Sequence, residues 1–309
     1  MFDSNVLSLT RPAPPAMHLR RQRTIGQAVT VSGVGFFTGA DATMTLAPAE
    51  AGHGITFERT DWPSGPIPAT IDHLAELPRR TALQDAHGTP VVQMIEHTMA
   101  ALAGLKLDNV RVTLDGPECP GFDGSSEELT GRLLDSGAVE QDAPQPAIEI
   151  THPILVGDDD AWIRAEPSPR GGYELSYRLE YASPHVGVQT YRVEMSPRVF
   201  QFQLADARTF ILEQEVGPLR QMGIGTRHTE RDLVVFGADG PINNTLRHSD
   251  EPVRHKLLDC VGDFALAGCE LRGRFTCHRS GHALNQALVR EVLATHAVVR
   301  SSVPTRRAA

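Results

Sequence analysis

Apolar and polar residues alternate in several short stretches after residue 25, and glycine and proline separate these stretches. An alternation of period two is typical of strands that bury one face. The pattern predicts strands at residues 28–34, 42–46, 55–59, 67–71 and 109–114. Residues 94–105 are rich in Ala, Leu and Met and have no breaker before Gly104, which indicates a helix.

The end of the first half combines a helix with a polar break. Residues 127–135 form a second helical stretch, and residues 140–146 (EQDAPQP) are polar and contain proline. Such a composition is typical of a linker. We therefore place a domain boundary near residue 144.

The second half repeats this succession of strands and helices. It has predicted strands at residues 147–154, 161–166, 173–181, 189–193 and 272–277, and predicted helices at 211–221, 252–267 and 283–294. The tetrapeptide Ala-Leu-Ala-Gly closes a predicted helix at residues 101–104 and again at 265–268. Many strands around few helices favour an α+β fold with two domains of similar topology over a doubly wound parallel sheet.

Charge is distributed unevenly along the chain of 309 residues. Its net charge is −9, but residues 1–24 and residues 300–309 each carry +3, which leaves −15 for the part between them. Such a body repels the phosphates of nucleic acid, so we expect no nucleic-acid partner. We predict a disordered basic arm at residues 1–22, domains at 23–144 and 145–301, and a basic tail at 302–309; a natural start at Met17 is an open alternative.

Composition also bears on the cellular location. No apolar run reaches the ~20 residues that a membrane span needs, and the N-terminal stretch lacks the apolar centre of a signal peptide. The four cysteines show no C-x-x-C spacing, so neither a zinc ribbon nor a disulfide framework is predicted. We expect a cytoplasmic protein that is soluble or at most peripheral to a membrane.

The predicted helix at residues 252–267 carries a candidate metal site. His255, Asp259 and Asp263 are four residues apart and so share one face. An imidazole and a carboxylate at this spacing can bind one metal ion, and catalytic zinc takes three protein ligands. An exposed i, i+4 pair is the alternative for so short a motif.

The best candidate for a third ligand is His97. It follows Glu96 at the start of an apolar helix, where two ionisable groups are costly without partners. A carboxylate beside the metal suits a general base that takes a proton from water. A capping Glu with a half-buried, satisfied His is the alternative.

Two further segments carry candidate chemistry. His282 lies at a glycine turn that opens the last helix, where it is either a reactive imidazole or a cap. Around it, Arg272, Arg274, His278 and Arg279 form a local basic patch, unless they are ordinary solvated surface. Residues 207–210 (ARTF) follow an extended stretch and are either functional or a simple strand-to-helix corner.

These segments together resemble, in order, the motifs of the UDP-3-O-acyl-N-acetylglucosamine deacetylase family, the zinc amidases that commit carbohydrate to lipid A synthesis. The similarity runs from about residue 23 to residue 299. Its motifs are residues 94–104 (MIEHTMAALAG), 107–109 (LDN), 117–118 (PE), 123–125 (DGS), 207–210 (ARTF), 253–263 (VRHKLLDCVGD) and 280–285 (SGHALN).

The resemblance implies a metal site and a general base. His97, His255 and Asp259 would bind zinc, with iron as the alternative metal. Glu96 would be the general base. The fold implied is two α+β domains whose core helices lie between sheets, with small inserts that shape the site and a passage for an acyl chain.

The resemblance also implies the other roles in the site. His282 would be a protonated imidazole that assists the oxyanion and the leaving amine, and Asp263 would orient it. Thr209 would donate its hydroxyl to the developing oxyanion. The residues that would contact substrate are Lys256, Phe210 and Arg279. The only other lysine, Lys106, is expected to be merely solvated.

The activity implied is hydrolysis of the N-acetyl group of UDP-3-O-acyl-N-acetylglucosamine, which gives acetate and UDP-3-O-acyl-glucosamine. The expected partner is this small UDP-linked acylated amino sugar, and the expected state is a monomer with peripheral inner-membrane contact left open. An amidase for another acylated amino sugar, or a non-catalytic nucleotide-sugar or lipid-binding relative, are the alternatives.

The chain departs from the family pattern at several positions. Residues 33–39 read GVGFFTG and lack the family His, and Leu212 replaces a Phe. Residues 225–227 read GTR instead of Gly-Gly-Ser, and Arg279 replaces a Lys. Most of these positions lie in or near the regions that shape the acyl passage, so the sequence leaves the acyl length open.

Overall fold

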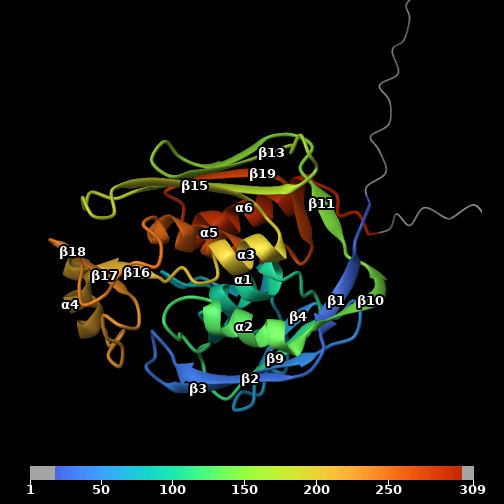
Figure 1. Cartoon of the computed structure of the whole chain (residues 1–309). Helices are drawn as coiled ribbons and strands as arrows, with labels where there is room; N and C mark the ends of the chain where they lie inside the picture. The colour runs from blue at the N-terminus through green and yellow to red at the C-terminus, as the bar shows by residue number, and fades with distance from the viewer. Residues whose placement is uncertain (1–17, 301–309) are drawn as a thin grey trace, which may run out of the picture.

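Two β-sheets lie on opposite sides of a central set of helices in the computed structural model, which describes residues 18–300 (Figure 1). The first sheet comes entirely from the first half of the chain and has the order β2-β3-β9-β4-β5. Its strands are β2 (Val29–Val34), β3 (Asp41–Pro48), β4 (Ile55–Arg59), β5 (Ile67–Pro68) and β9 (Val110–Leu114).

The second sheet comes from the second half of the chain, and its main path has the order β12-β13-β19-β14-β15, with β11 beside β19. Its strands are β11 (Ala147–Glu149), β12 (Ile154–Gly157), β13 (Trp162–Glu166), β14 (Tyr173–Glu180), β15 (Val188–Glu194) and β19 (Glu270–His278). Alternate residues of β19 are buried, as the period-two pattern predicts. The α+β class, with core helices between sheets, is confirmed.

The central helices are apolar on the sides that meet each other. They are α1 (Glu96–Gly104), α2 (Glu127–Ser136), α3 (Pro197–Gln203), α5 (Glu251–Phe264) and α6 (His282–Thr295). A Cβ on Gly262 of α5 would lie 2.1 Å from the carbonyl oxygen of Glu96, so only glycine permits the observed approach of α5 to the start of α1. This approach brings the metal-ligand candidates of the two halves together.

Two small inserts project from this framework. The first is a three-stranded sheet of β6 (Leu74–Ala75), β7 (Ala82–Gln84) and β8 (Pro90–Gln93). The second, at the left in Figure 1, consists of β16 (Phe210–Leu212), α4 (Glu213–Gln221), β17 (Val234–Gly237) and β18 (Gly240–Pro241). No residue of α4 is fully buried. The buried side chains of the second insert therefore come from its strands, as Phe210, Val234 and Phe236 do, and not from α4.

Several local predictions are corrected. The segment predicted as a linker is mostly strand, because β10 (Ala138–Pro144) pairs antiparallel with β1 (Arg21–Ile25). Main-chain pairing of this kind needs no apolar pattern, so the composition concealed it. Arg21 and Gln22, the end of the predicted basic arm, belong to β1. Residues 1–17 and residues 301–309 lie outside the described residues.

Other boundaries also differ from the prediction. The predicted strand at residues 67–71 ends at Pro68 and is followed by the short 3-10 helix η1 (Ile71–His73). The predicted helix at 211–221 begins only at Glu213, because the preceding residues pair with β17. The helix predicted at 252–267 ends at Phe264 and continues as the 3-10 helix η2 (Ala265–Ala267). The helix α3 was not predicted.

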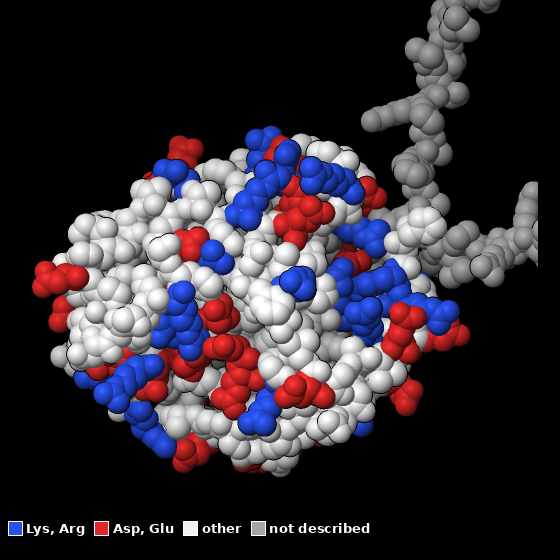
Figure 2. All heavy atoms as spheres, viewed as in Figure 1, with Lys and Arg blue, Asp and Glu red and all other residues white. Residues whose placement is uncertain are grey.

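Lys106 has a partner rather than only solvent. Its Nζ donates to Glu270 Oε1 at 2.7 Å, which joins the turn after α1 to β19 of the second sheet. Acidic and basic side chains are interspersed on the face of the molecule that Figure 2 shows. Among residues 18–300 no helix has the length and apolar character that crossing a membrane requires.

Candidate functional site

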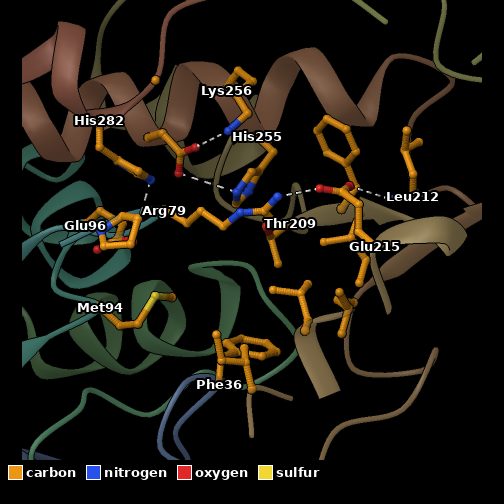
Figure 3. A pocket seen from close by; sticks show the side chains of 18 of the residues that line it. Phe36, Arg79, Met94, Glu96, Thr209, Leu212, Glu215, His255, Lys256 and His282 are labelled. Carbon is orange, nitrogen blue, oxygen red and sulfur yellow. Dashed lines mark hydrogen bonds and ion pairs between the residues drawn. The ribbon is translucent and has the colours of Figure 1, made fainter. Parts of the chain in front are cut away.

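A pocket of about 1240 Å³ lies where α1, α5 and α6 meet the insert that contains α4 (Figure 3). Nine of the ten predicted site residues line it, namely Glu96, His97, Thr209, Phe210, His255, Lys256, Asp259, Arg279 and His282. The tenth, Asp263, is completely buried and contacts His282 from behind. The structure therefore brings together all ten predicted site residues, which come from both halves of the chain.

His97, His255 and Asp259 form a cluster suited to a metal ion. Their ligand atoms lie within 4.8 Å of one another. Asp259 Oδ1 lies 3.6 Å from His97 Nε2 and 3.4 Å from His255 Nε2. This oxygen is buried and has no hydrogen-bond partner, which is costly for a carboxylate unless a cation binds there. The donor set of two imidazoles and one carboxylate is one that zinc accepts.

His255 is held in the form that a metal ligand needs. Its Nδ1 lies 3.0 Å from the carbonyl oxygen of Ala207, so Nδ1 carries the proton and Nε2 presents a lone pair to the cluster. Burial lowers the pKa of His255 to about 4, although the nearby Asp259 carboxylate opposes this effect. The imidazole is therefore neutral near pH 7.

Lys256 completes the charge balance around Asp259. Its Nζ donates to Asp259 Oδ2 at 2.9 Å and leaves Oδ1 free for a metal. Burial alone would raise the pKa of Asp259, but His255 and Lys256 outweigh it and hold that pKa well below its usual value. Burial would lower the pKa of Lys256, and the Asp259 carboxylate more than reverses this. Both side chains are ionised.

Glu96 begins α1, and its side chain is almost completely buried. Its Oε2 accepts a hydrogen bond from the main-chain N–H of Thr81 at 3.1 Å, and its Oε1 lies 3.8 Å from His282 Nε2. Burial raises the pKa of this carboxyl, and His282 and His97 oppose the shift. A carboxylate with a raised pKa is a better proton acceptor than an exposed one.

His282 begins α6, directly after Gly281. Its Nδ1 lies 2.8 Å from Asp263 Oδ2, and Asn285 Nδ2 donates to the same oxygen at 2.8 Å. Burial lowers the pKa of His282, but Asp263 and Glu96 outweigh it and raise the pKa to about 10. The imidazole is therefore protonated at neutral pH, and it lines the pocket.

A buried ion pair positions Thr209. The guanidinium of Arg208 contacts Glu251 through Nε at 2.8 Å and through a second nitrogen at 3.1 Å, and the main-chain N–H of Arg208 donates to Glu251 as well. Glu251 begins α5, so the pair joins the Thr209 segment to the helix that carries His255. Glu251 precedes the predicted helix at residues 252–267 and was not among the predicted site residues.

The rest of the pocket is largely apolar and is bounded by the inserts. Its apolar lining includes Phe36, Met94, Leu212, Val216, Leu219 and Ile224. Arg79 extends across the pocket toward the second insert and reaches Glu215 Oε1 at 2.6 Å (Figure 3). The ring of Phe36 stacks on His228 with centroids 4.1 Å apart. These contacts join the first half of the chain to the second insert on two sides of the pocket.

Glu118 holds the loop at residues 35–39, where the chain departs from the family pattern. Its buried carboxylate accepts hydrogen bonds from the main-chain N–H groups of Phe37 and Thr38 and from the Thr38 hydroxyl. Glu118 was quoted among the motifs but was not predicted to have a role. Its proximity to this loop has no signal in the sequence, because the two are about eighty residues apart.

Only one residue of the predicted basic patch reaches the pocket, whereas the other three lie together on the partly exposed face of β19. Arg279 lines the pocket, but Arg272, Arg274 and His278 do not. Arg272 pairs with Glu270 at 3.1 Å, Arg274 lies 3.6 Å from Glu166, and His278 stacks on Trp162. All three lie on β19, where they contact acidic or aromatic residues of β19 itself and of the neighbouring β13.

Comparison with known proteins agrees with this geometry. The family model described as UDP-3-O-acyl N-acetylglycosamine deacetylase matches residues 22–294. A protein of Anaeromyxobacter sp. (strain Fw109-5) named UDP-3-O-acyl-N-acetylglucosamine deacetylase is 38% identical over 294 residues, which cover 93% of this chain and 95% of that protein.

Proteins with the same name from other bacteria are similarly related. The one from Myxococcus xanthus (strain DK1622) is 37% identical over 93% of this chain and 90% of its own length. The one from Pasteurella multocida (strain Pm70) is 37% identical over 89% of this chain and 90% of its own length. On these matches, the chain belongs to the UDP-3-O-acyl-N-acetylglucosamine deacetylase family.

Proposed function

We propose that this protein hydrolyses the N-acetyl group of UDP-3-O-acyl-N-acetylglucosamine and releases acetate and UDP-3-O-acyl-glucosamine, as a step of lipid A biosynthesis. The observation that carries the proposal is the buried, unpaired Asp259 Oδ1 between two imidazoles, with Glu96 and His282 in the same pocket. The substrate is inferred from the names of the relatives. The pocket supplies the chemistry of a metal-assisted amidase.

The residues present fit a zinc ion. His97, His255 and Asp259 would hold it, with iron as the alternative metal. When bound, such a metal supplies a Lewis acid that polarises the amide carbonyl and makes water more acidic. The buried Lys256, which neutralises the other oxygen of Asp259, keeps that carboxylate ionised and ready for a cation.

Glu96 and His282 divide the proton transfers between them. Glu96, whose pKa is raised by burial, takes the proton of the attacking water. His282, protonated at neutral pH, stabilises the developing oxyanion and donates its proton to the departing amine. Asp263 holds the imidazole through Nδ1 and so directs Nε2 toward the reacting atoms. A base and an acid with separated pKa values are what amide hydrolysis requires.

The remaining predicted residues position the substrate. Thr209 donates its hydroxyl to the developing oxyanion, at a position that the Arg208–Glu251 pair fixes. Lys256 and Arg279 provide positive charge to sugar or phosphate oxygens, and Phe210 packs against the sugar. The apolar lining near Phe36 and Leu219 would take the acyl chain.

Other properties stay predictions from the sequence. They are the division into domains at residues 23–144 and 145–301, the monomeric state, and the cytoplasmic location with peripheral inner-membrane contact left open. An amidase for a different acylated amino sugar is the second candidate function. This candidate is kept because the loop at residues 35–39 differs from the family pattern and contributes Phe36 and Phe37 to the pocket lining.

Acetate release from the purified UDP-linked substrate tests the proposal. Turnover that a chelator abolishes and added zinc restores is the expected result. Turnover of a related acylated amino sugar but not of this substrate would favour the second candidate. Absence of both turnover and stoichiometric zinc or iron would overturn the proposal in favour of a binding protein.

A further inference from the structure

Thr81 contacts Glu96, the proposed base, and Asp263, the residue that holds the proposed acid His282. It directly precedes β7 in the first half of the chain, and it is 1% exposed. Its main-chain N–H donates to Glu96 Oε2 at 3.1 Å. Its hydroxyl lies 2.6 Å from Asp263 Oδ1, although 182 residues separate the two in the chain. No motif of the sequence indicated a role for this residue.

The chemistry of the neighbours fixes the direction of the Thr81 hydroxyl. Asp263, when ionised, can only accept hydrogen bonds, so the single hydroxyl proton points to its Oδ1. Gln286 Nε2 can only donate, and it lies 3.4 Å from the same hydroxyl oxygen. The same oxygen also lies 3.4 Å from His282 Nδ1, so the hydroxyl donates to Asp263 and has Gln286 and His282 beside its lone pairs.

Both oxygens of Asp263 are consequently occupied. Oδ1 accepts from Thr81 at 2.6 Å, and Oδ2 accepts from His282 at 2.8 Å and from Asn285 at 2.8 Å. A carboxylate that is held at one oxygen alone can rotate about its terminal bond, because the preferred angles of this torsion cover a broad range. The contact with Thr81 stops this rotation and so fixes the plane of the group that holds His282.

We infer that Thr81 is a positioning residue that sets Glu96 and His282 relative to each other, the first through its main-chain N–H and the second through Asp263. It lies at the junction of the two halves, because Glu96 comes from α1 and Asp263 from α5. This inference rests on the proposed function, since it assigns Glu96 and His282 to one reaction. A misplacement of reacting groups by about 1 Å can cost 10²-fold in rate.

Thr81→Val tests the inference, because it removes the hydroxyl while it keeps the side-chain shape and the main-chain N–H. We expect kcat for the UDP-linked substrate to fall about 10- to 100-fold, with KM within about twofold and the bound metal unchanged. Thr81→Ser keeps the donor and is expected to hold kcat within about threefold of the wild type.

Thr24→Val is the matched control. Thr24 is also buried, and its hydroxyl donates to the Asn109 carbonyl oxygen at 2.6 Å, but it does not line the pocket. The control should lose a similar buried hydrogen bond and thermal stability while it keeps the wild-type kcat. If Thr81→Val does not fold, Thr81→Ala removes the same donor without a methyl group against Asp263.

Three results would overturn the inference in an enzyme whose wild type is active. They are a wild-type kcat in Thr81→Val, an equal loss of kcat in Thr24→Val, and a Thr81→Ser variant as slow as Thr81→Val with its metal bound. An inactive wild-type protein would count against the proposed function instead. The experiment therefore distinguishes failure of the inference on Thr81 from failure of the proposed function.

Discussion

His282 Nδ1 and Asp263 Oδ2 lie 2.8 Å apart, and Asp263 has no exposure to solvent. Burial lowers the pKa of His282, but this carboxylate and Glu96 raise it to about 10, so the imidazole keeps its proton at neutral pH and loses it only as the pH rises toward that value. An activity that needs protonated His282 is therefore present at neutral pH and lost in alkali.

Asp263→Asn should move the alkaline limb of the kcat profile to lower pH. The substitution removes an opposite charge in direct contact, which is worth about 1 to 3 pH units. The measurement is kcat against pH for both proteins, with metal content as the control. An alkaline limb at the same pH in both would show that another group sets it.

Glu96→Ala should lower kcat by about 10² to 10⁴-fold, the usual contribution of a general acid or base, while the metal stays bound. The reason is that Glu96 faces His282 and Thr81 rather than belonging to the three-residue metal cluster. Steady-state kinetics together with metal analysis checks this. Loss of the metal in this variant would identify Glu96 as a ligand instead.

Lys256→Arg should raise KM by about tenfold, equivalent to about 1.4 kcal/mol. Lys256 offers substrate oxygens a compact point charge that is held beside Asp259 Oδ2 at 2.9 Å, and the larger planar guanidinium of Arg cannot place its charge at the same point. Lys106→Arg is the matched control, because Lys106 pairs with Glu270 away from this pocket. Equal KM values for the wild type and both variants would refute a substrate-contacting role for Lys256.

Reversing the charge of Arg79 or of Glu215 should raise KM for the acylated substrate about 1.5- to 5-fold, and the double reversal should recover most of the loss. Arg79 has a φ of +65°, and its side chain spans the pocket to reach Glu215. The pair is partly exposed, so its contribution lies within the ~0.2–1 kcal/mol of surface ion pairs and weakens with salt. Additive effects in the double variant would rule out coupling.

Gly262→Ala should lower the free energy of unfolding by about 1–3 kcal/mol and weaken metal binding. Its Cβ would lie 2.1 Å from the Glu96 carbonyl oxygen, which forces α1, with His97, away from α5, with Asp259. Gly131→Ala on α2 is the control, because its Cβ meets nothing within 4 Å. Denaturant unfolding and zinc titration of both variants and the wild type test this prediction. A free energy of unfolding in Gly262→Ala equal to that of the wild type would contradict it.

The features that depend on local periodicity could be predicted from the sequence alone. His255, Asp259 and Asp263 share one face of α5 because a helix has 3.6 residues per turn, and this holds wherever the helix lies in the protein. The alternating strands and the α+β class follow from the same kind of pattern. The motifs around Glu96, His97 and His282 identified the other residues of the site. Their positions in the chain do not give the distances between their side chains in the folded protein.

Contacts between residues that are far apart in the chain depend on the tertiary structure and could not be predicted. The contacts of Thr81 with Asp263, of Arg208 with Glu251 and of Lys106 with Glu270 join segments that are far apart in the sequence. Single threonines, glutamates and lysines are common, and a main-chain N–H has no side-chain signature, so no pattern could have revealed them. Such contacts arise from the packing of the helices between two sheets, where most buried polar groups are hydrogen-bonded.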